Sequence, residues 1–322
     1  MRQSLWFNSL WFNSKHNSNG LNKLLNLYRD RATKALGLPS WFIWNMELGW
    51  GVDRVFDGNY HGNDALAKPV NIAILDTGID TSNPELAGHV TWQYDATGHN
   101  NVVDETGHGT AVAGIISASY NGIGTAGVAT HATLYSVKVL DGPNGQGEWN
   151  WLSDGIYAAV AGPDGIVGTH DDANIISMSL ESQGEVPPTY VHDAVNWALA
   201  HGVILVAAAG NSGDGNLRTT EITYPAAYPG VIAVGATGMN DQPTSWSNSA
   251  SYVRLYAPGD NIITTYINDQ YIIGSGTSLA VPFVSGLLAY YVANGGSSSH
   301  AQHYLLAHGD HIGHHLRLVQ YT

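Results

Sequence analysis

The sequence predicts an α/β fold with a mostly parallel central sheet and helices on both faces. After Pro69, short apolar runs rich in β-branched residues alternate with segments of helical periodicity. Of the 322 residues, 44% are apolar and 12% are charged, a composition that supports a buried core and argues against disorder. Because strands that alternate with helices are typical of covered parallel sheets, we expect one large α/β unit.

The predicted elements follow one another in alternating order. Five apolar runs indicate buried strands: 70–75, 134–140, 175–180, 203–208 and 231–234. Three segments between them have helical periodicity: 111–119, 151–161 and 190–200. In such folds functional side chains gather where strands end and helices begin, so the junctions are where a site is expected.

Residues 1–43 form a predicted basic N-terminal extension, and 44–322 form the main domain. The first 40 residues hold six Lys or Arg and one Asp, and they begin with a tandem Ser-Leu-Trp-Phe-Asn repeat. Apolar positions over 21–36 follow helical spacing and predict a basic amphipathic helix. Three interpretations stay open: a helix packed on the main domain, a removable or inhibitory pro-segment remnant, and a helix at a membrane surface.

Composition excludes several classes of function. The net charge of −14 repels phosphate backbones, so nucleic-acid binding is not expected. The absence of cysteine excludes disulfides, a thiol nucleophile and cysteine-ligated zinc. The longest apolar stretch, 279–293, is interrupted by Pro282 and is shorter than the roughly 18 residues of a membrane span, so we expect no membrane span.

Three short motifs supply a carboxylate, an imidazole and a hydroxyl at predicted junctions. Asp76 ends the first apolar strand, His108 opens a helix between glycines, and Ser278 follows a glycine-rich turn at the start of another helix. A serine hydroxyl attacks a carbonyl efficiently only when a neighbouring base takes its proton, and a carboxylate orients that base. Asn211, just after a buried strand, supplies an amide for the developing oxyanion.

The sequence resembles the subtilisin-like serine proteases. The motifs that carry the resemblance are DTGID at 76–80, GHGTAVAG at 107–114, AAAGN at 207–211 and GTSLAVP at 276–282. It implies the three-layer subtilisin-like fold, with Asp76, His108 and Ser278 as catalytic triad and Asn211 as oxyanion donor. It also implies a broadly specific serine endopeptidase that acts as a monomer on protein or peptide substrates and needs no cofactor for the chemistry.

The segments expected to bind substrate depart from the family pattern at one position. The family's usual Ser-Leu-Gly is here Ser179, Leu180 and Glu181, which adds a carboxylate near the pocket. The opposite wall would be formed by small residues: Ala208, Ala209 and Gly210. Small side chains leave room for an apolar substrate residue, so we expect an apolar P1 preference.

A structural calcium ion is a second implication of the resemblance. The run 119–125 resembles the family's calcium loop, in which an Asn side chain and alternate backbone carbonyls meet one ion. The corresponding residues are Ser119, Asn121, Ile123 and Thr125, with Glu85 as the carboxylate where the family usually has Asp. Oxygen ligands of this kind suit a hard cation.

Other segments and other functions stay open. The acidic stretch 162–173 and the six histidines within 300–315 are expected to be a solvated turn and a polar, divergent tail. The rival activities are acyl transfer to an amine, as in subtilisin-like peptide cyclases, and non-catalytic binding by a protease-like domain. The resemblance favours an extracellular enzyme, with a cytoplasmic one as the alternative because no complete secretory signal is visible.

Overall fold

The computed structural model describes residues 4–6, 10–17, 47–62, 64–182, 185–313 and 315–321. Nine strands form its main sheet, in the spatial order β13-β14-β10-β9-β8-β7-β3-β5-β4. Every neighbouring pair is parallel except β13 and β14. The strands are β3 (Asn71–Asp76), β4 (Val90–Asp95), β5 (Thr133–Lys138), β7 (Ile175–Met178), β8 (Ile204–Ala208), β9 (Ile232–Thr237), β10 (Leu255–Pro258), β13 (Asp310–His311) and β14 (Arg317–Leu318).

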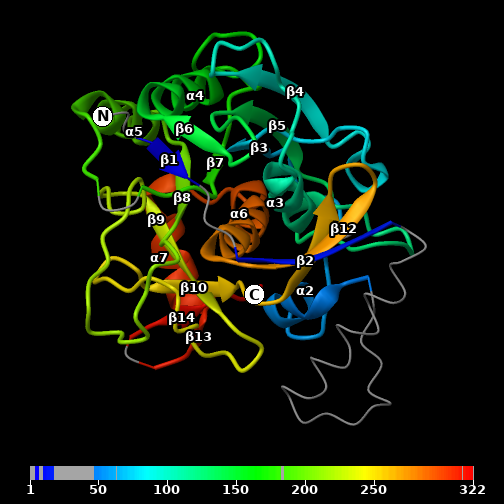
Figure 1. Cartoon of the computed structure of the whole chain (residues 1–322), viewed down its shortest axis with the longest axis vertical. Coiled ribbons are helices and arrows are strands. Elements are labelled where there is room, and N and C mark those ends of the chain that lie inside the picture. Colours follow the sequence, from blue (N-terminus) through cyan, green and yellow to red (C-terminus); the bar gives the residue numbers. More distant parts are fainter. Residues whose placement is uncertain are drawn as a thin grey trace.

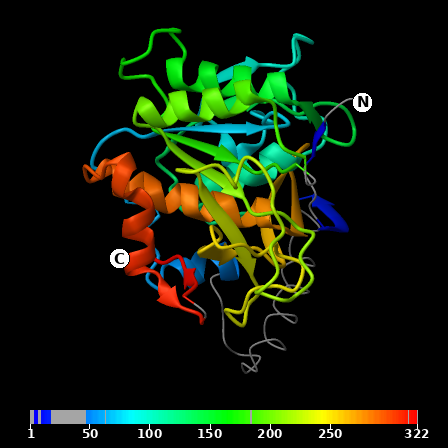
Figure 2. The ribbon, with the colours of Figure 1, turned by 90° about the vertical axis from the view of Figure 1, so that its left-hand side faces the viewer.

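Helices cover both faces of this sheet, so the molecule has three layers (Figures 1 and 2). One face carries α2 (Gly49–Val55), α3 (His108–Ser117), α6 (Thr277–Ala293) and α7 (Ser298–His308). The other face carries α4 (Trp149–Ala161) and α5 (Thr189–Ala200), which pack against each other. Along β3, Ile72 and Ile74 belong to the first core, and Ala73 and Leu75 belong to the second. The alternation follows from the two-residue period of a strand that is buried on both sides.

Two small antiparallel sheets join the N-terminal extension to the main domain. β2 (Leu10–Asn17) pairs with β12 (Gln270–Ser275), which in turn pairs with β11 (Ile262–Tyr266). β1 (Ser4–Trp6) pairs with β6 (Gln146–Glu148). Each copy of the tandem repeat therefore contributes residues to a strand, a role that the repeat alone did not predict. The expected helix at 21–36 lies outside the described residues.

The predicted α/β class with its mostly parallel sheet is confirmed. The five predicted strands correspond to β3, β5, β7, β8 and β9, and the three predicted helices correspond to α3, α4 and α5. The largest difference is at α3, which begins at His108 and not at Ala111, because the carboxylate of Asp104 accepts hydrogen bonds from the Gly107 and Thr110 amides. In the part of the chain that the structure describes, no single helix is long and apolar enough to cross a membrane.

Candidate active site

Asp76 and His108 form a buried hydrogen-bonded pair. Asp76 is the last residue of β3, and His108 is the first residue of α3. His108 Nδ1 lies 2.7 Å from Asp76 Oδ1, and the two side chains are 0% and 1% exposed. The same carboxylate oxygen accepts a hydrogen bond of 2.7 Å from the Thr77 backbone N–H. With its Nδ1–H donated to this carboxylate, the imidazole keeps Nε2 as the atom that can take a proton.

Asp104 holds the turn that presents His108, and sequence reasoning missed it. Its Oδ1 accepts from Gly107 N at 2.8 Å and from Thr77 Oγ1 at 2.8 Å. Its Oδ2 accepts from Thr110 N at 2.9 Å and from Thr110 Oγ1 at 2.6 Å. The available signal was an Asp shortly before a helix start, because such a residue accepts hydrogen bonds from the first helical amides.

The packing at the start of α3 also explains a glycine of the His108 motif. A Cβ added to Gly109 would lie 2.1 Å from the Gly78 carbonyl oxygen. The Gly109 backbone N–H donates to Thr77 Oγ1 at 3.0 Å, so the loop after β3 and the first turn of α3 touch directly. Only a residue without a side chain permits this approach, which brings the aspartate and the histidine together.

Ser278 lies at the beginning of α6, which packs against α3. Its side chain is 2% exposed, and its Oγ donates to the Ser179 carbonyl oxygen at 3.0 Å. In return, Ser179 Oγ donates to the Ser278 carbonyl oxygen at 2.7 Å. These two bonds fix the start of α6 to the end of β7, so the serine meets one of the two segments expected to bind substrate.

Asn211 follows β8 and contacts the residue that precedes Ser278. Its side-chain oxygen accepts hydrogen bonds from Thr277 N at 2.8 Å and from Thr277 Oγ1 at 3.0 Å. The Gly210 backbone N–H also donates to Thr277 Oγ1, at 3.1 Å. These contacts fix the orientation of the side-chain amide, whose nitrogen carries two N–H donors.

The two segments expected to line the P1 site lie side by side. They follow β7 and β8, neighbouring parallel strands in which Met178 is in register with Ala207. Leu180 and Ala209 are buried in the core beneath α4 and α5, and Ala208 is buried in the opposite core. Glu181 extends toward Gly210: a Cβ on that glycine would lie 2.4 Å from Glu181 Oε2. The carboxylate therefore lies between the two walls.

The buried carboxylate of Glu181 has few interactions that would stabilise its negative charge. The residue is 2% exposed, and neither carboxylate oxygen has a hydrogen-bond partner of good geometry among the described residues. Burial raises the pKa of Glu181 to about 7, and the backbone N–H of Asn211 offsets only part of that rise. A buried carboxyl group with so large a pKa shift is a candidate functional residue.

The residues of the expected calcium loop surround two buried carboxylates. Asn121 Nδ2 donates to Glu85 Oε2 at 3.2 Å, and the Tyr271 hydroxyl donates to Glu85 Oε1 at 2.7 Å. Glu47 Oε1 accepts from the backbone amides of Asn121 at 2.6 Å and Gly122 at 2.9 Å. Burial raises the pKa of Glu85, and the nearby charge of Glu47 raises it further. Sequence reasoning missed Glu47, because it lies far from the loop in the chain.

The other three predicted calcium residues, Ser119, Ile123 and Thr125, differ in their contacts and in their exposure. Ser119 donates its backbone N–H to the Glu85 carbonyl oxygen at 3.0 Å, and its hydroxyl lies 3.0 Å from His89 Nε2. Ile123 is 60% exposed, whereas Thr125 is 2% exposed. Because the Ile123 side chain is a hydrocarbon, its backbone carbonyl is the only candidate calcium ligand of that residue.

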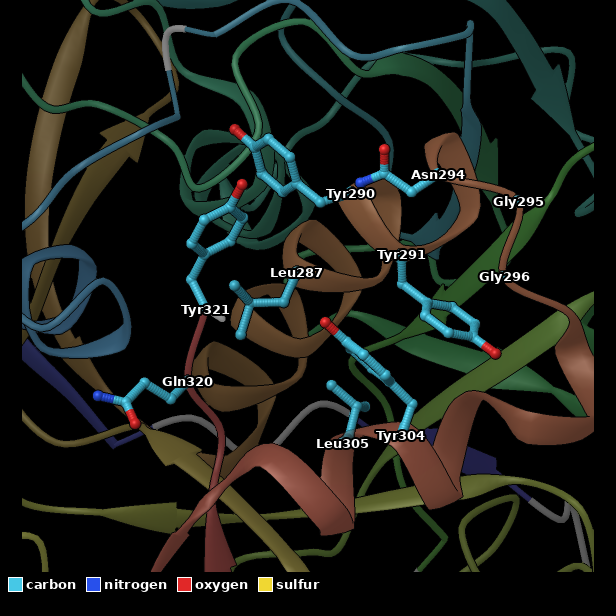
Figure 3. Close-up of a pocket in the computed structure, with 10 residues that line it drawn as sticks. All are labelled: Leu287, Tyr290, Tyr291, Asn294, Gly295, Gly296, Tyr304, Leu305, Gln320 and Tyr321. Atoms are coloured by element: carbon cyan, nitrogen blue, oxygen red, sulfur yellow. The ribbon is translucent and has the colours of Figure 1, made fainter.

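A cavity of about 340 Å³ lies at the other end of α6 (Figure 3). Tyr290, Tyr291, Tyr304 and Tyr321 line it, and the rings of Tyr290 and Tyr321 have centroids 5.0 Å apart. Tyr290 is twelve positions further along the helix than Ser278, which corresponds to about 18 Å at 1.5 Å per residue. The cavity is therefore separate from the candidate active site.

The acidic and histidine-rich stretches contain no metal centre in the described residues. Asp171 and Asp172 accept hydrogen bonds from backbone groups of their own turn, including Asp164 N and Gly168 N. The described histidines of this stretch are exposed, and no group of three or more His, Cys, Asp or Glu in the described ranges has the geometry to hold a metal ion.

Comparisons with known proteins agree with this geometry. The model of the family described as "Subtilase family" matches residues 67–309. The chain is 43% identical over 248 residues to the "Major intracellular serine protease" of Bacillus subtilis (strain 168), covering 76% of this chain and 74% of that protein. Its identity to "Subtilisin E" of the same organism is 34% over 253 residues, covering 79% of this chain and 63% of that protein.

Similar proteins include both intracellular and extracellular enzymes. The "Minor extracellular protease Epr" of Bacillus subtilis (strain 168) is 40% identical over 223 residues, which cover 69% of this chain and 32% of that protein. The match to the family model spans the residues from β3 to the end of α7, including all four motifs identified in the sequence. The chain therefore belongs to the subtilase family and is a subtilisin-like serine endopeptidase.

Proposed function

We propose that Asp76, His108 and Ser278 hydrolyse peptide bonds through an acyl-enzyme intermediate. The single observation that carries this proposal is the buried 2.7 Å contact between His108 Nδ1 and Asp76 Oδ1 at the head of α3, the helix that packs against the one beginning at Ser278. The aspartate keeps the imidazole in the tautomer that leaves Nε2 as the base, and it stabilises the imidazolium that forms.

The reaction begins when His108 Nε2 takes the proton of Ser278 Oγ. The hydroxyl first exchanges its hydrogen bond to the Ser179 carbonyl for one to the imidazole, by rotation about its Cα–Cβ bond. Oγ then attacks the scissile carbonyl, and the oxyanion accepts hydrogen bonds from Asn211 Nδ2 and the Ser278 backbone N–H. His108 returns the proton to the leaving amine, and water hydrolyses the acyl-enzyme by the same route.

These side chains supply all of the acyl-transfer chemistry, so the reaction needs no cofactor. We expect the enzyme to act on protein or peptide substrates as a monomer. An apolar P1 preference, based on the small residues 208–210, stays a prediction.

Replacing the nucleophile tests the proposal. Ser278→Ala should abolish peptide hydrolysis while leaving the circular dichroism spectrum unchanged, because no other hydroxyl is proposed to attack the carbonyl. The exposed Ser299→Ala variant is the matched control and should keep the kcat/KM of the parent enzyme. Turnover by Ser278→Ala close to that of the parent would remove Ser278 from the mechanism.

We also propose that the 1–43 extension is an inhibitory pro-segment. Its strand β2 pairs with β12, and the last paired residue, Ser275, lies three residues before Ser278. β1 adds a second antiparallel pairing, with β6. The extension is basic and the main domain is acidic, so electrostatic attraction contributes to the association.

Deleting residues 1–43 tests this role. The truncated enzyme should have a higher kcat/KM on a small peptide substrate, and the difference from the full chain should shrink as salt screens the attraction. Equal or lower activity in a folded truncated enzyme would contradict the proposal. A truncated chain that does not fold would show instead that the extension is a structural part of the enzyme.

A calcium ion at the loop beside Glu85 is a further proposal. Two buried carboxylates, Glu85 and Glu47, lie close enough for the charge of one to raise the pKa of the other, and the donor set consists of oxygens. Such a pair fits a hard divalent cation. Glu85, Glu47, the Asn121 side-chain oxygen and the backbone carbonyls of Ser119, Ile123 and Thr125 would hold it. The ion would stabilise the fold and would not touch substrate.

A further inference from the structure

The carboxylate of Glu181 lies between the two segments that are expected to bind substrate. Glu181 belongs to the segment whose first residue, Ser179, exchanges two hydrogen bonds with Ser278. Its Oε2 reaches to within 2.4 Å of the position that a Cβ on Gly210 would occupy, in the opposite wall. The carboxylate therefore lies against the opposite segment, and it belongs to a residue two positions along the chain from Ser179.

The carboxylate of Glu181 lacks the hydrogen bonds and ion pairs that usually stabilise a buried charge. Its two oxygens are buried without hydrogen-bond partners of good geometry, and the residue takes part in none of the ion pairs formed by the described residues. Burying a carboxylate in this way opposes folding unless a cation or a donor completes it. A poorly compensated carboxylate between the two segments expected to bind substrate therefore points to a partner carried by the substrate.

We propose that Glu181 determines the P1 specificity of this enzyme by selecting a Lys or Arg side chain, whose cation pairs with its carboxylate. The inference rests on the proposed function, because it takes Ser278 as the nucleophile and the segments after β7 and β8 as the walls of the P1 site. It replaces the expectation of an apolar P1 residue, which was based on the small residues of one wall.

The ionisation of Glu181 is compatible with this role in mildly alkaline solution. Its pKa is raised to about 7, so the group is mostly ionised at pH 8 before a substrate binds. A cation beside the carboxylate lowers the pKa further, because an opposite charge favours the ionised form. The groups next to it, Gly210 and the side-chain amide of Asn248, are neutral and do not compete for the cation.

Gly210, in the segment opposite Glu181, leaves space for the Glu181 carboxylate. A Cβ at position 210 would also lie 2.3 Å from Asn248 Nδ2, so both polar groups are packed against the bare α-carbon of Gly210. Any larger residue there would displace one of them. Glu181 could also fill space and exclude bulky P1 residues, and the charge and the volume of the side chain can be tested separately.

The test is a series of peptide substrates that differ only at P1. Lys is compared with norleucine and Arg with citrulline, because each pair has nearly the same length and differs in charge. At pH 8 the parent enzyme should cleave each cationic substrate at least tenfold better, by kcat/KM, than its uncharged partner. Glu181→Gln, which keeps the size of the side chain, should reduce both ratios to within twofold of one.

Two further variants complete the experiment. Glu185→Gln makes the same charge change at an exposed position four residues further on, and it should keep the ratios of the parent. Glu181→Gly should also lose the charge preference and should cleave substrates with Phe at P1 faster. The inference would be overturned if the kcat/KM ratios of the parent enzyme were near one, or if Glu181→Gln left them unchanged. Ser278→Ala is assayed on the same substrates, so the role of Ser278 is tested separately.

Discussion

Two buried acids of this enzyme, Asp104 before α3 and Glu181 after β7, have opposite environments. Asp104 is 3% exposed. Its carboxylate accepts hydrogen bonds from three hydroxyl groups and from the backbone amides of Thr106, Gly107 and Thr110. Glu181 is 2% exposed, and among the described residues neither oxygen has a hydrogen-bond partner of good geometry, although the backbone N–H of Asn211 partly offsets the rise in its pKa. The difference shows that burial alone does not define a role. Asp104 holds the turn before His108, whereas we propose that a substrate cation pairs with Glu181.

The largest effect is expected from removing the compensated acid. Asp104→Ala should lower the free energy of unfolding by about 3–5 kcal/mol, because it leaves several buried donors without an acceptor. Urea unfolding measures this in a Ser278→Ala background, which prevents autolysis. The exposed neighbour Glu105→Ala should change the value by less than about 0.5 kcal/mol. If Asp104→Ala lowered the free energy of unfolding by less than about 1 kcal/mol, the hydrogen bonds of Asp104 would not distinguish it from Glu181.

Asn211 links the start of α6 to Glu181, because its side-chain oxygen accepts a hydrogen bond from Thr277 N and its backbone N–H lowers the pKa of Glu181. Asn211→Leu should lower kcat and leave KM nearly unchanged, since its side-chain amide acts mainly in the transition state. For subtilisin itself, the loss of one such donor lowers kcat by about 10²–10³, and we adopt that magnitude. Steady-state kinetics, with the exposed Asn216→Leu as control, measure the effect. An unchanged kcat would exclude Asn211 from the oxyanion site.

The uncompensated acid should make stability depend on pH. Because folding raises the pKa of Glu181 from 4.5 to about 7, folding favours the protonated form. The stability that this group contributes is complete below pH 4.5 and is lost as the pH rises to about 7. Glu181→Gln does not titrate, so its free energy of unfolding relative to the parent should rise by up to about 3 kcal/mol across that interval. A difference that is constant with pH would contradict this environment.

Glu85 is intermediate between the two acids, since two side chains donate to it while a second carboxylate lies nearby. If calcium compensates it, EDTA should lower the Tm of the Ser278→Ala enzyme. The ion contributes about 2.7 kcal/mol when its concentration is a hundredfold above its Kd. Asn121→Ala should have a low Tm that no longer responds to EDTA. A Tm that EDTA does not change in the parent, or changes equally in Asn121→Ala, would show that the loop holds no calcium.

The sequence predicted the local features of this enzyme and missed those that depend on tertiary contact. The periodicity of the apolar residues was enough to predict the strands and helices of the central layers, because each of those segments is buried on one or both faces. It was also enough to place Asp76 and His108 at neighbouring junctions. Glu47 was missed because its contacts to Asn121 and Gly122 join segments more than 70 residues apart. The burial of Glu181 likewise depends on a neighbouring strand.

The most direct test of the catalytic assignment is covalent labelling with a fluorophosphonate, followed by peptide mass mapping. A fluorophosphonate reacts with a serine whose hydroxyl is activated by a neighbouring base, so the label reports the assembled triad and not the serine alone. The account predicts one adduct, on the peptide that contains Ser278, with labelling lost in Ser278→Ala and strongly slowed in His108→Ala. An adduct on another residue, or equal labelling of Ser278→Ala, would contradict it.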